Sequence, residues 1–237
     1  MSYDDKDVID FSEPAPKKPG RIQRIVLEFF DLASFFLMAM GIVLCIRFFI
    51  FSPFTVVGQS MEPTFHSSDF VIIDKVSSQK MKLYEWSSDT GASNQIKTLV
   101  SSSIQALPEI RRGDIIVFVP PGKDIHYIKR VIGLPGETVK IEDNDKVVIC
   151  KTQGPSDCFT LDETYLPSEY KTLAVCGVSE FVVTEGFFVM GDNREHSTDS
   201  RCCFTIGCFG DKKGYIVPYD YIIGKVRMRI LPDFVMY

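Results

Sequence analysis

The sequence DIHYIKRVIGLPG, residues 124–136, is rich in β-branched and aromatic residues and ends in a Pro-Gly turn. This combination is typical of a β-strand. Side chains alternate between the two faces of a strand, so one face carries Ile125, Tyr127, Lys129 and Val131. That face is apolar except for Lys129, and the sequence therefore predicts a lysine held among apolar neighbours.

Short apolar runs of the same kind recur along the chain and are separated by Gly, Pro and Asp turns. They lie at residues 70–73, 115–119, 125–132, 138–141, 181–183, 187–190 and 222–230. No convincing helical periodicity occurs outside the N-terminal region, so we expect a mainly β domain of antiparallel sheets. Two insertions interrupt it: a Ser-rich polar loop at about 77–110, and a small β subdomain at about 142–180.

Residues 29–51 (FFDLASFFLMAMGIVLCIRFFIF) form the one strongly apolar run. As a helix these residues would span about 34 Å, enough for a bilayer core of about 30 Å. A cleavable signal peptide is an alternative, but no A-x-A-like site follows the run. A buried core helix is another, but the run is apolar on all faces. We expect one retained transmembrane anchor, whose charges Asp31 and Arg47 lie near its ends.

The residues that flank this anchor predict its orientation. Residues 1–28 form a polar tail with basic residues at Lys17, Lys18, Arg21 and Arg24. Positive flanks favour the cytoplasmic side, which places residues 52–237 outside the membrane. Six of the seven cysteines lie in the C-terminal half, which fits disulfides in an oxidising compartment, free buried thiols being the alternative. Cys150 and Cys158 are expected to pair across a short hairpin.

Composition excludes some classes of function. The chain is 45% hydrophobic and 24% charged, and its net charge of −5 argues against a nucleic-acid-binding protein. The three histidines form no HExxH pattern, and no metal or organic cofactor is predicted.

Ser60, in the sequence GQSMEPT, is a candidate nucleophile close after the anchor. A serine hydroxyl needs a base to become nucleophilic. Histidine is the usual base, but His66, His126 and His196 have no recognisable partner pattern. Lys129 is the better candidate, because burial among apolar side chains lowers the pKa of a lysine and allows a neutral amine near pH 7. The neighbouring Arg130 stays protonated and faces the other way.

Other serine chemistries fit less well. The Gly-x-Ser-x-Gly pattern fails because Pro63 follows Glu62 where the second glycine should be. A Ser-x-x-Lys match at 77–80 lacks the partner motifs of penicillin-recognising enzymes and lies in the polar insertion. The polar segment 191–201 (GDNREHSTDSR) follows an apolar strand and could buttress a site.

Four ordered blocks of sequence resemble the bacterial type I signal peptidases of the Ser/Lys class. The blocks are residues 60–64 (SMEPT), 112–118 (RGDIIVF), 127–136 (YIKRVIGLPG) and 191–201 (GDNREHSTDSR). A single anchor before the first block also matches this family. The resemblance covers most of residues 29–229 outside the insertions.

The resemblance implies a role for individual residues. Ser60 would be the acyl-forming nucleophile and Lys129 the general base. Ser197 would orient the lysine amine, and Asp199 would form a supporting ion pair with Arg201. Structural residues of that loop would be Gly191, Asp192 and Asn193. Small substrate pockets, which favour alanine at the first and third positions before the cut, would be lined by Met61, Pro63, Phe65 and Tyr127.

Gly58 departs from many members of that family, which carry a serine two residues before the nucleophile. Without that hydroxyl the oxyanion hole would rest on the backbone N–H of Ser60. A side-chain donor to an oxyanion, where one is used, contributes about 10²–10³ in rate.

The resemblance implies an enzyme of the bacterial cytoplasmic membrane whose catalytic domain lies on the outer, periplasmic side. Its partners would be membrane-bound precursors with signal peptides and the lipid bilayer, with the secretion machinery as a further candidate and no nucleic acid. Two alternatives remain open: a maturation protease for one dedicated exported substrate, and a non-catalytic anchored β domain that binds peptides.

Overall fold

The computed structural model describes residues 20–78, 109–120, 124–142, 145–151, 157–205 and 215–237. The chain divides into two compact units, Met1–Cys45 and Ile46–Tyr237, each of which is described by itself. Most of the predicted insertion at 77–110 lies outside the described residues, as does the tail before Gly20.

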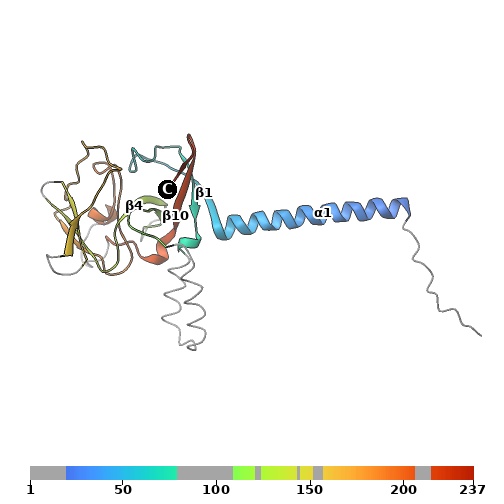
Figure 1. Cartoon of the computed structure of the whole chain (residues 1–237), viewed down its shortest axis with the longest axis horizontal. Helices are drawn as coiled ribbons and strands as arrows, with labels where there is room; N and C mark the ends of the chain where they lie inside the picture. The colour runs from blue at the N-terminus through green and yellow to red at the C-terminus, as the bar shows by residue number, and fades with distance from the viewer. Residues whose placement is uncertain (1–19, 79–108, 121–123, 143–144, 152–156, 206–214) are drawn as a thin grey trace, which may run out of the picture. The chain divides into compact units, whose positions relative to one another are not determined.

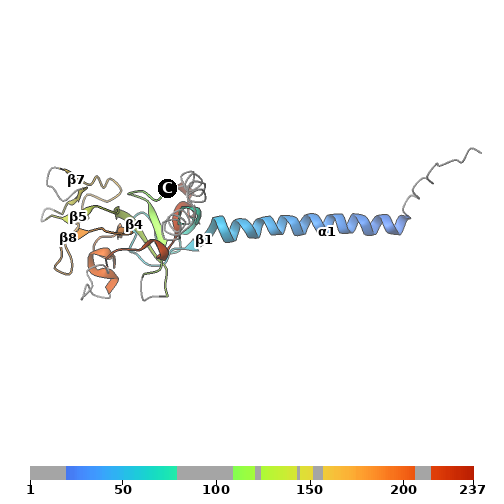
Figure 2. The same cartoon turned by 90° about the horizontal axis from the view of Figure 1, so that it is seen from below.

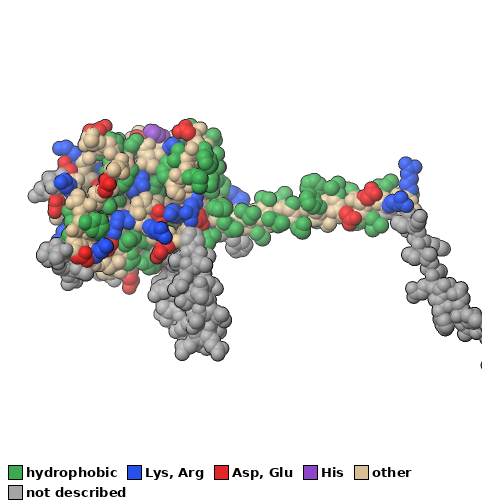
Figure 3. Space-filling model, viewed as in Figure 1, with side chains coloured by type: hydrophobic (Ala, Val, Ile, Leu, Met, Phe, Trp, Pro, Cys, Tyr) green, Lys and Arg blue, Asp and Glu red, His purple; other side chains and the backbone are tan. Residues whose placement is uncertain are grey.

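The N-terminal unit contains one long helix, α1 (Arg21–Cys45) (Figure 1). It begins before the predicted start at residue 29, because residues 21–28 (RIQRIVLE) contain no Pro or Gly and are mostly good helix formers. A π-helical turn, Ile46–Ile50, follows in the second unit, and Phe51 already belongs to a strand. Apolar side chains cover α1 (Figure 3), and the segment Arg24–Cys45 is long and apolar enough to cross a bilayer.

The second unit is built from two antiparallel sheets, which confirms the predicted mainly β fold. The larger has the strand order β1-β2-β10-β3-β4-β9, with β11 beside β10. Its strands are β1 (Phe51–Thr55), β2 (Phe70–Asp74), β3 (Ile115–Phe118), β4 (Tyr127–Gly133), β9 (Phe188–Met190), β10 (Ile222–Leu231) and β11 (Val235–Met236). The smaller has the order β7-β6-β5-β8 (Figure 2). Its strands are β5 (Thr138–Ile141), β6 (Val147–Cys150), β7 (Cys158–Thr160) and β8 (Glu180–Val182).

Each apolar run that the sequence predicted as a strand overlaps an observed strand. The strands β1, β6, β7 and β11 lie outside those runs. The small sheet also extends beyond the predicted insertion at 142–180, because β5 precedes that insertion and pairs with both β6 and β8.

Strand β3 lies at the centre of the large sheet and is buried on both faces. Ile115 and Val117 pack in one hydrophobic cluster, whereas Ile116 and Phe118 pack in another. This explains the unbroken apolar sequence IIVF, which has no polar face. In the pairing with β4, Ile116 lies opposite Lys129 and Ile115 lies opposite Arg130. Residues directly opposite share a face, so the two adjacent basic residues enter different sides of the sheet.

The disulfides confirm the prediction that the C-terminal cysteines are oxidised. Cys150 and Cys158 pair at directly opposed positions of β6 and β7, as expected. A second bridge joins Cys176 to Cys202, and Cys203 is also disulfide-bonded. Cys45, in α1, has a free thiol.

Candidate active site

Ser60 lies in the turn between β1 and β2, and side chains of this turn pack into the hydrophobic core. Met61 and Phe65 are 1% and 0% exposed and belong to the hydrophobic cluster of β2 and β3. The Phe65 N–H donates to the Met61 carbonyl oxygen over 2.9 Å. Both residues, which were predicted to line substrate pockets, are buried in this cluster, and their role towards a substrate stays a prediction. Ser60 itself is half-buried, so its hydroxyl is held by a packed turn and stays accessible.

Lys129 extends from β4 to this serine. Its Nζ lies 2.6 Å from the Ser60 Oγ and 2.9 Å from the Ile128 carbonyl oxygen, and both contacts are hydrogen bonds. The Lys129 residue is only 3% exposed. Neighbours on its side of the sheet include Val131, which is fully buried, and Tyr127, whose ring centroid is 5.5 Å from Nζ. The structure therefore brings together the two residues that sequence analysis selected as nucleophile and base.

Burial lowers the pKa of Lys129 from 10.5 to about 8. The loss of hydration is the largest cause, because it penalises the charged ammonium. The carboxylates of Asp199 and Asp192 act against it and raise the pKa, whereas the guanidinium of Arg201 lowers it. The outcome is an amine that is substantially neutral just above pH 8 and can accept a proton from a hydroxyl 2.6 Å away.

The loop at 191–201 packs directly against Ser60. The Asn193 N–H donates to the carbonyl oxygen of Ser60 over 3.1 Å. A Cβ atom added to Gly191 would lie 2.4 Å from that same oxygen and 2.1 Å from the Oγ of Ser197. Only glycine can bring its backbone this close to Ser60 and Ser197, so the glycine of the GDNR sequence has a packing role.

The hydroxyl oxygen of Ser197 is buried, but it makes no hydrogen bond with the described residues. Sequence analysis expected it to hydrogen-bond the amine of Lys129, and no such bond is present. Its Oγ and the Ser60 carbonyl both lie beside Gly191, so Ser197 is a neighbour of the nucleophile.

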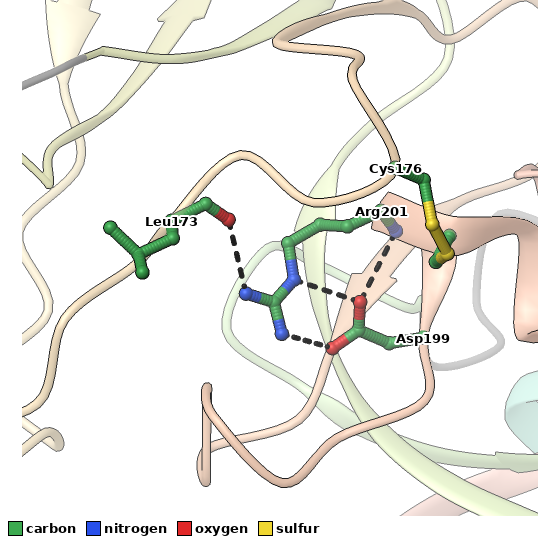
Figure 4. The surroundings of a disulfide bond; sticks show 5 residues. Leu173, Cys176, Asp199 and Arg201 are labelled. Atoms are coloured by element: carbon green, nitrogen blue, oxygen red, sulfur yellow. Dashed lines mark hydrogen bonds and ion pairs between the residues drawn. A yellow bond between two sulfur atoms is a disulfide. The ribbon is translucent and has the colours of Figure 1, made fainter.

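Asp199 and Arg201 form a buried bidentate ion pair (Figure 4). The guanidinium Nε and a terminal nitrogen of Arg201 each lie 2.9 Å from a different carboxylate oxygen, and both side chains are 1% exposed. Asp199 also accepts hydrogen bonds from the backbone N–H groups of Gly191 and Arg201, each over 3.1 Å. The pair therefore closes the 191–201 loop on itself, in the arrangement expected for a supporting pair.

Asp192 anchors the same loop to the turn that carries Ser60. Its carboxylate accepts two hydrogen bonds from Arg130, over 2.8 and 2.6 Å, and one from the Thr64 hydroxyl over 2.5 Å. Sequence analysis did not assign Arg130 and Thr64 to the site. The only indication in the sequence was that both residues lie in matched blocks, because their partner Asp192 is distant in sequence.

The three histidines do not take the place of Lys129. In the described part of the chain none is hydrogen-bonded to Ser60; His126 packs its ring against Phe54, and His196 contacts the side chain of Asn193.

Gly58 has a φ of +98°, a conformation that strains any residue with a Cβ. Glycine at this position is therefore consistent with the local backbone as well as with a missing side-chain donor.

Comparison with known proteins gives one consistent family. Residues 29–231 match the family model described as signal peptidase, peptidase S26. A signal peptidase I of Bacillus licheniformis is 31% identical over 179 residues, covering 73% of this chain and 77% of the relative. Signal peptidase I S of Bacillus subtilis is 33% identical over 179 residues, covering 72% and 77%.

Similar proteins are also found in other bacteria. A signal peptidase I of Rickettsia typhi is 31% identical over 225 residues, covering 83% of this chain and 78% of the relative. The crystal structure of a signal peptidase I from Enterococcus faecalis shares 29% identity, with coverage of 50% of this chain and 97% of that one and a TM-score of 0.35.

Proposed function

The chain belongs to the signal peptidase S26 family, and from this membership we propose that Ser60 is its nucleophile and Lys129 its general base. As a signal peptidase I it is a serine endopeptidase that removes signal peptides by the Ser/Lys mechanism of that family. One observation carries the assignment of the two residues. It is the 2.6 Å contact between Lys129 Nζ and Ser60 Oγ, in a site where burial lowers the lysine pKa to about 8.

Acylation follows from this geometry. The neutral amine of Lys129 accepts the hydroxyl proton as the Ser60 Oγ attacks the carbonyl carbon of the scissile peptide bond. The resulting ammonium then donates that proton to the nitrogen of the departing chain. The products of this step are an ester between Ser60 and the signal peptide, a free mature N-terminus and a neutral Lys129. Water then attacks the ester carbonyl carbon while Lys129 accepts a proton from it. The bond to Ser60 Oγ breaks, the ammonium of Lys129 returns the proton to that oxygen, and the signal peptide leaves with a free carboxyl group.

The negative oxygen of the tetrahedral intermediate needs a donor in the turn of the nucleophile. The Ser60 N–H is suited to this role, because it donates no hydrogen bond to a described residue. Gly58 offers no side-chain donor, so the backbone supplies this stabilisation. Asp199 and Arg201 hold the 191–201 loop against the nucleophile, and the Ser197 hydroxyl lies beside Gly191 in this loop.

The substrate is the extended segment that follows the apolar part of a signal peptide, with small residues before the cut. Tyr127 and Pro63 lie on or near the surface beside Ser60 and Lys129 and are suited to contact this segment. Helix α1 anchors the enzyme in the cytoplasmic membrane, with its N-terminus in the cytoplasm and Ile46–Tyr237 outside. The bilayer and membrane-bound precursors are its partners, and the secretion machinery is a further partner to test.

The test is cleavage of a precursor with an Ala-x-Ala site by the full chain in liposomes. Wild type, Ser60→Ala and Lys129→Ala are compared, and N-terminal sequencing of the product locates the cut. We expect cleavage by wild type at the Ala-x-Ala site and none by either variant, with all three proteins folded. Activity that survives in Lys129→Ala would assign the base to another residue.

A panel of unrelated precursors separates the general enzyme from a dedicated maturation protease. Cleavage of several precursors supports the general role. Cleavage of a single one would identify the narrower enzyme of the same chemistry.

A further inference from the structure

A segment outside the matched motifs holds the 191–201 loop in place. Residues 163–176, here called the strap, run between β7 and β8 without regular secondary structure. The strap contacts the loop, and the strand that carries Lys129, through side chains that are distant from the loop in sequence. None of its residues was selected by sequence analysis as part of the site.

The first link is the side chain of Arg194, which belongs to the loop and is fully buried. Its guanidinium forms an ion pair with Glu163 and hydrogen bonds to the hydroxyls of Tyr165 and Thr172, all on the strap. Its Nε donates to the carbonyl oxygen of Gly191 over 3.1 Å. One arginine therefore connects three strap residues to the start of the loop.

The second link is the aromatic ring of Tyr165. The guanidinium of Arg130 stacks over this ring, 3.9 Å from its centroid, while the same guanidinium binds Asp192. The Tyr165 hydroxyl also donates to the Glu163 carboxylate over 2.7 Å. Glu163 and Tyr165 thus form one unit that contacts both of the arginines.

The far end of the strap is tied to the other end of the loop (Figure 4). Arg201, the partner of Asp199, also donates to the carbonyl oxygen of Leu173 over 3.4 Å. The next residue after Arg201 is Cys202, which forms the disulfide with Cys176. The strap is therefore attached near both ends of the loop, and Arg194 fixes the end that contacts the nucleophile.

We propose that Glu163 and Tyr165 are positioning residues for the Ser60–Lys129 dyad, acting through Arg194 and Arg130. This inference rests on the assignment of the dyad above. The loop bonds the Ser60 carbonyl through the Asn193 N–H, so a shift of the loop shifts the nucleophile. A displacement of about 1 Å at a reacting group can lower a rate about 10²-fold.

A loosened loop also changes the surroundings of Lys129. Loss of hydration is the largest influence on the pKa of this amine, so water admitted beside the loop raises that pKa towards its ordinary value. The rise in activity with pH would then occur at higher pH. A residue that only stabilises the fold lowers the amount of active enzyme and leaves this midpoint unchanged.

The experiment compares Glu163→Gln with Glu169→Gln in the full chain. Glu163→Gln removes the charge that Arg194 binds but keeps the side-chain shape. Glu169 is an exposed acid on the same strap, and among the described residues it accepts only a 3.4 Å hydrogen bond from the Ser168 hydroxyl. For Glu163→Gln we expect kcat to fall about tenfold or more, with little change in KM and an acid limb moved to higher pH. Glu169→Gln should match wild type in all three quantities.

Tyr165→Phe is a second test, because it removes the hydroxyl and leaves the ring on Arg130. It should also lower kcat, but by a smaller factor than Glu163→Gln. If Glu163→Gln does not fold, Tyr165→Phe is the variant that tests the proposal. Ser60→Ala is assayed beside them. If Ser60→Ala is inactive while Glu163→Gln and Tyr165→Phe both keep the wild-type kcat and pH midpoint, this inference alone is overturned. An active Ser60→Ala would instead overturn the proposed dyad.

Discussion

The pH dependence of kcat/KM is the most direct test of a lysine base in this enzyme. Only neutral Lys129 can accept the proton of Ser60, and burial lowers the pKa of its amine to about 8. For one titrating group with that pKa, the competent fraction is about 1% at pH 6, about 9% at pH 7 and about 90% at pH 9. We therefore expect kcat/KM to rise about tenfold between pH 7 and pH 9 and then to level off.

The position of the plateau distinguishes the possible bases. A lysine with its ordinary pKa of 10.5 would give a rate that still rises about tenfold per pH unit near pH 9. A histidine base would give a midpoint near its ordinary pKa of about 6.5. A midpoint near 8 therefore reports a lysine from which water has been removed.

The assay measures initial rates with a precursor peptide well below KM, because kcat/KM then reports the free enzyme. Ionic strength is kept constant from about pH 5.5 to about pH 10.5, a range that brackets the midpoints expected for histidine and lysine. Each enzyme sample is returned to pH 8 afterwards to show that activity recovers and that no unfolding has occurred. A profile that stays flat across this range, or one with a midpoint near that of histidine, would refute the reasoning.

Three further perturbations test the packing of the site. Lys129→Met should be inactive, but thermal unfolding at pH 7 should show it to be more stable than wild type by up to about 3 kcal/mol. This gain in stability should fade as pH rises from about 8 to about 10.5, because in that range the unfolded state of wild type binds more protons than the folded state. Gly191→Ala should lose about 10²-fold or more in kcat, because its Cβ would lie 2.4 Å from the Ser60 carbonyl oxygen; wild-type kcat would contradict this. Cys176→Ser opens a bridge between residues 26 apart in sequence and should lower the free energy of unfolding by about 3–4 kcal/mol, with chemical denaturation as the measurement; an unchanged midpoint would argue that Cys202 is held by its other contacts.

The sequence predicted the fold class well because most strands are runs of β-branched and aromatic residues. Of the strands outside the predicted runs, β6 (Val147–Cys150) lies in the segment interpreted as an inserted β subdomain, and the others are short or adjoin other apolar sequence. β7 and β11 have three and two residues, too few for alternation to be seen. β1 (FSPFT) contains a proline, which weakens a strand prediction, and it follows the apolar anchor without a break. Where the helix ends and the strand begins was therefore not visible in the sequence.

The proximity of Lys129 and Ser60 could be expected from sequence, because alternation placed Lys129 on an apolar face and the matched blocks supplied Ser60. The groups that fix the dyad were not accessible in the same way. Arg130 and Asp192 are 62 residues apart, and Arg194 and Glu163 are 31 apart. Local patterns carry no information about which charges meet across such separations. The expected hydrogen bond between Ser197 and the Lys129 amine is absent, and the sequence could not show this. A single hydrogen bond depends on side-chain packing that periodicity does not determine.

The ion pairs of Asp199 and Asp192 explain why Lys129 can be neutral at all. Two carboxylates, Asp199 and Asp192, lie near its amine, and each raises its pKa. An unpaired carboxylate a few ångströms away would stabilise the ammonium and leave no base at neutral pH. Here each carboxylate binds an arginine through two hydrogen bonds, Asp199 within the loop and Asp192 from β4, so much of its charge is compensated.

With the carboxylates compensated, the loss of hydration at Lys129 outweighs their attraction, and the net effect on its pKa is a decrease. The arginines thus have a chemical consequence beyond holding the loop. They allow acidic residues to fix the backbone beside the nucleophile without protonating the base. A serine–lysine dyad built beside acidic loop residues requires such partners, because the same carboxylates alone would stabilise the inactive, charged form of the lysine.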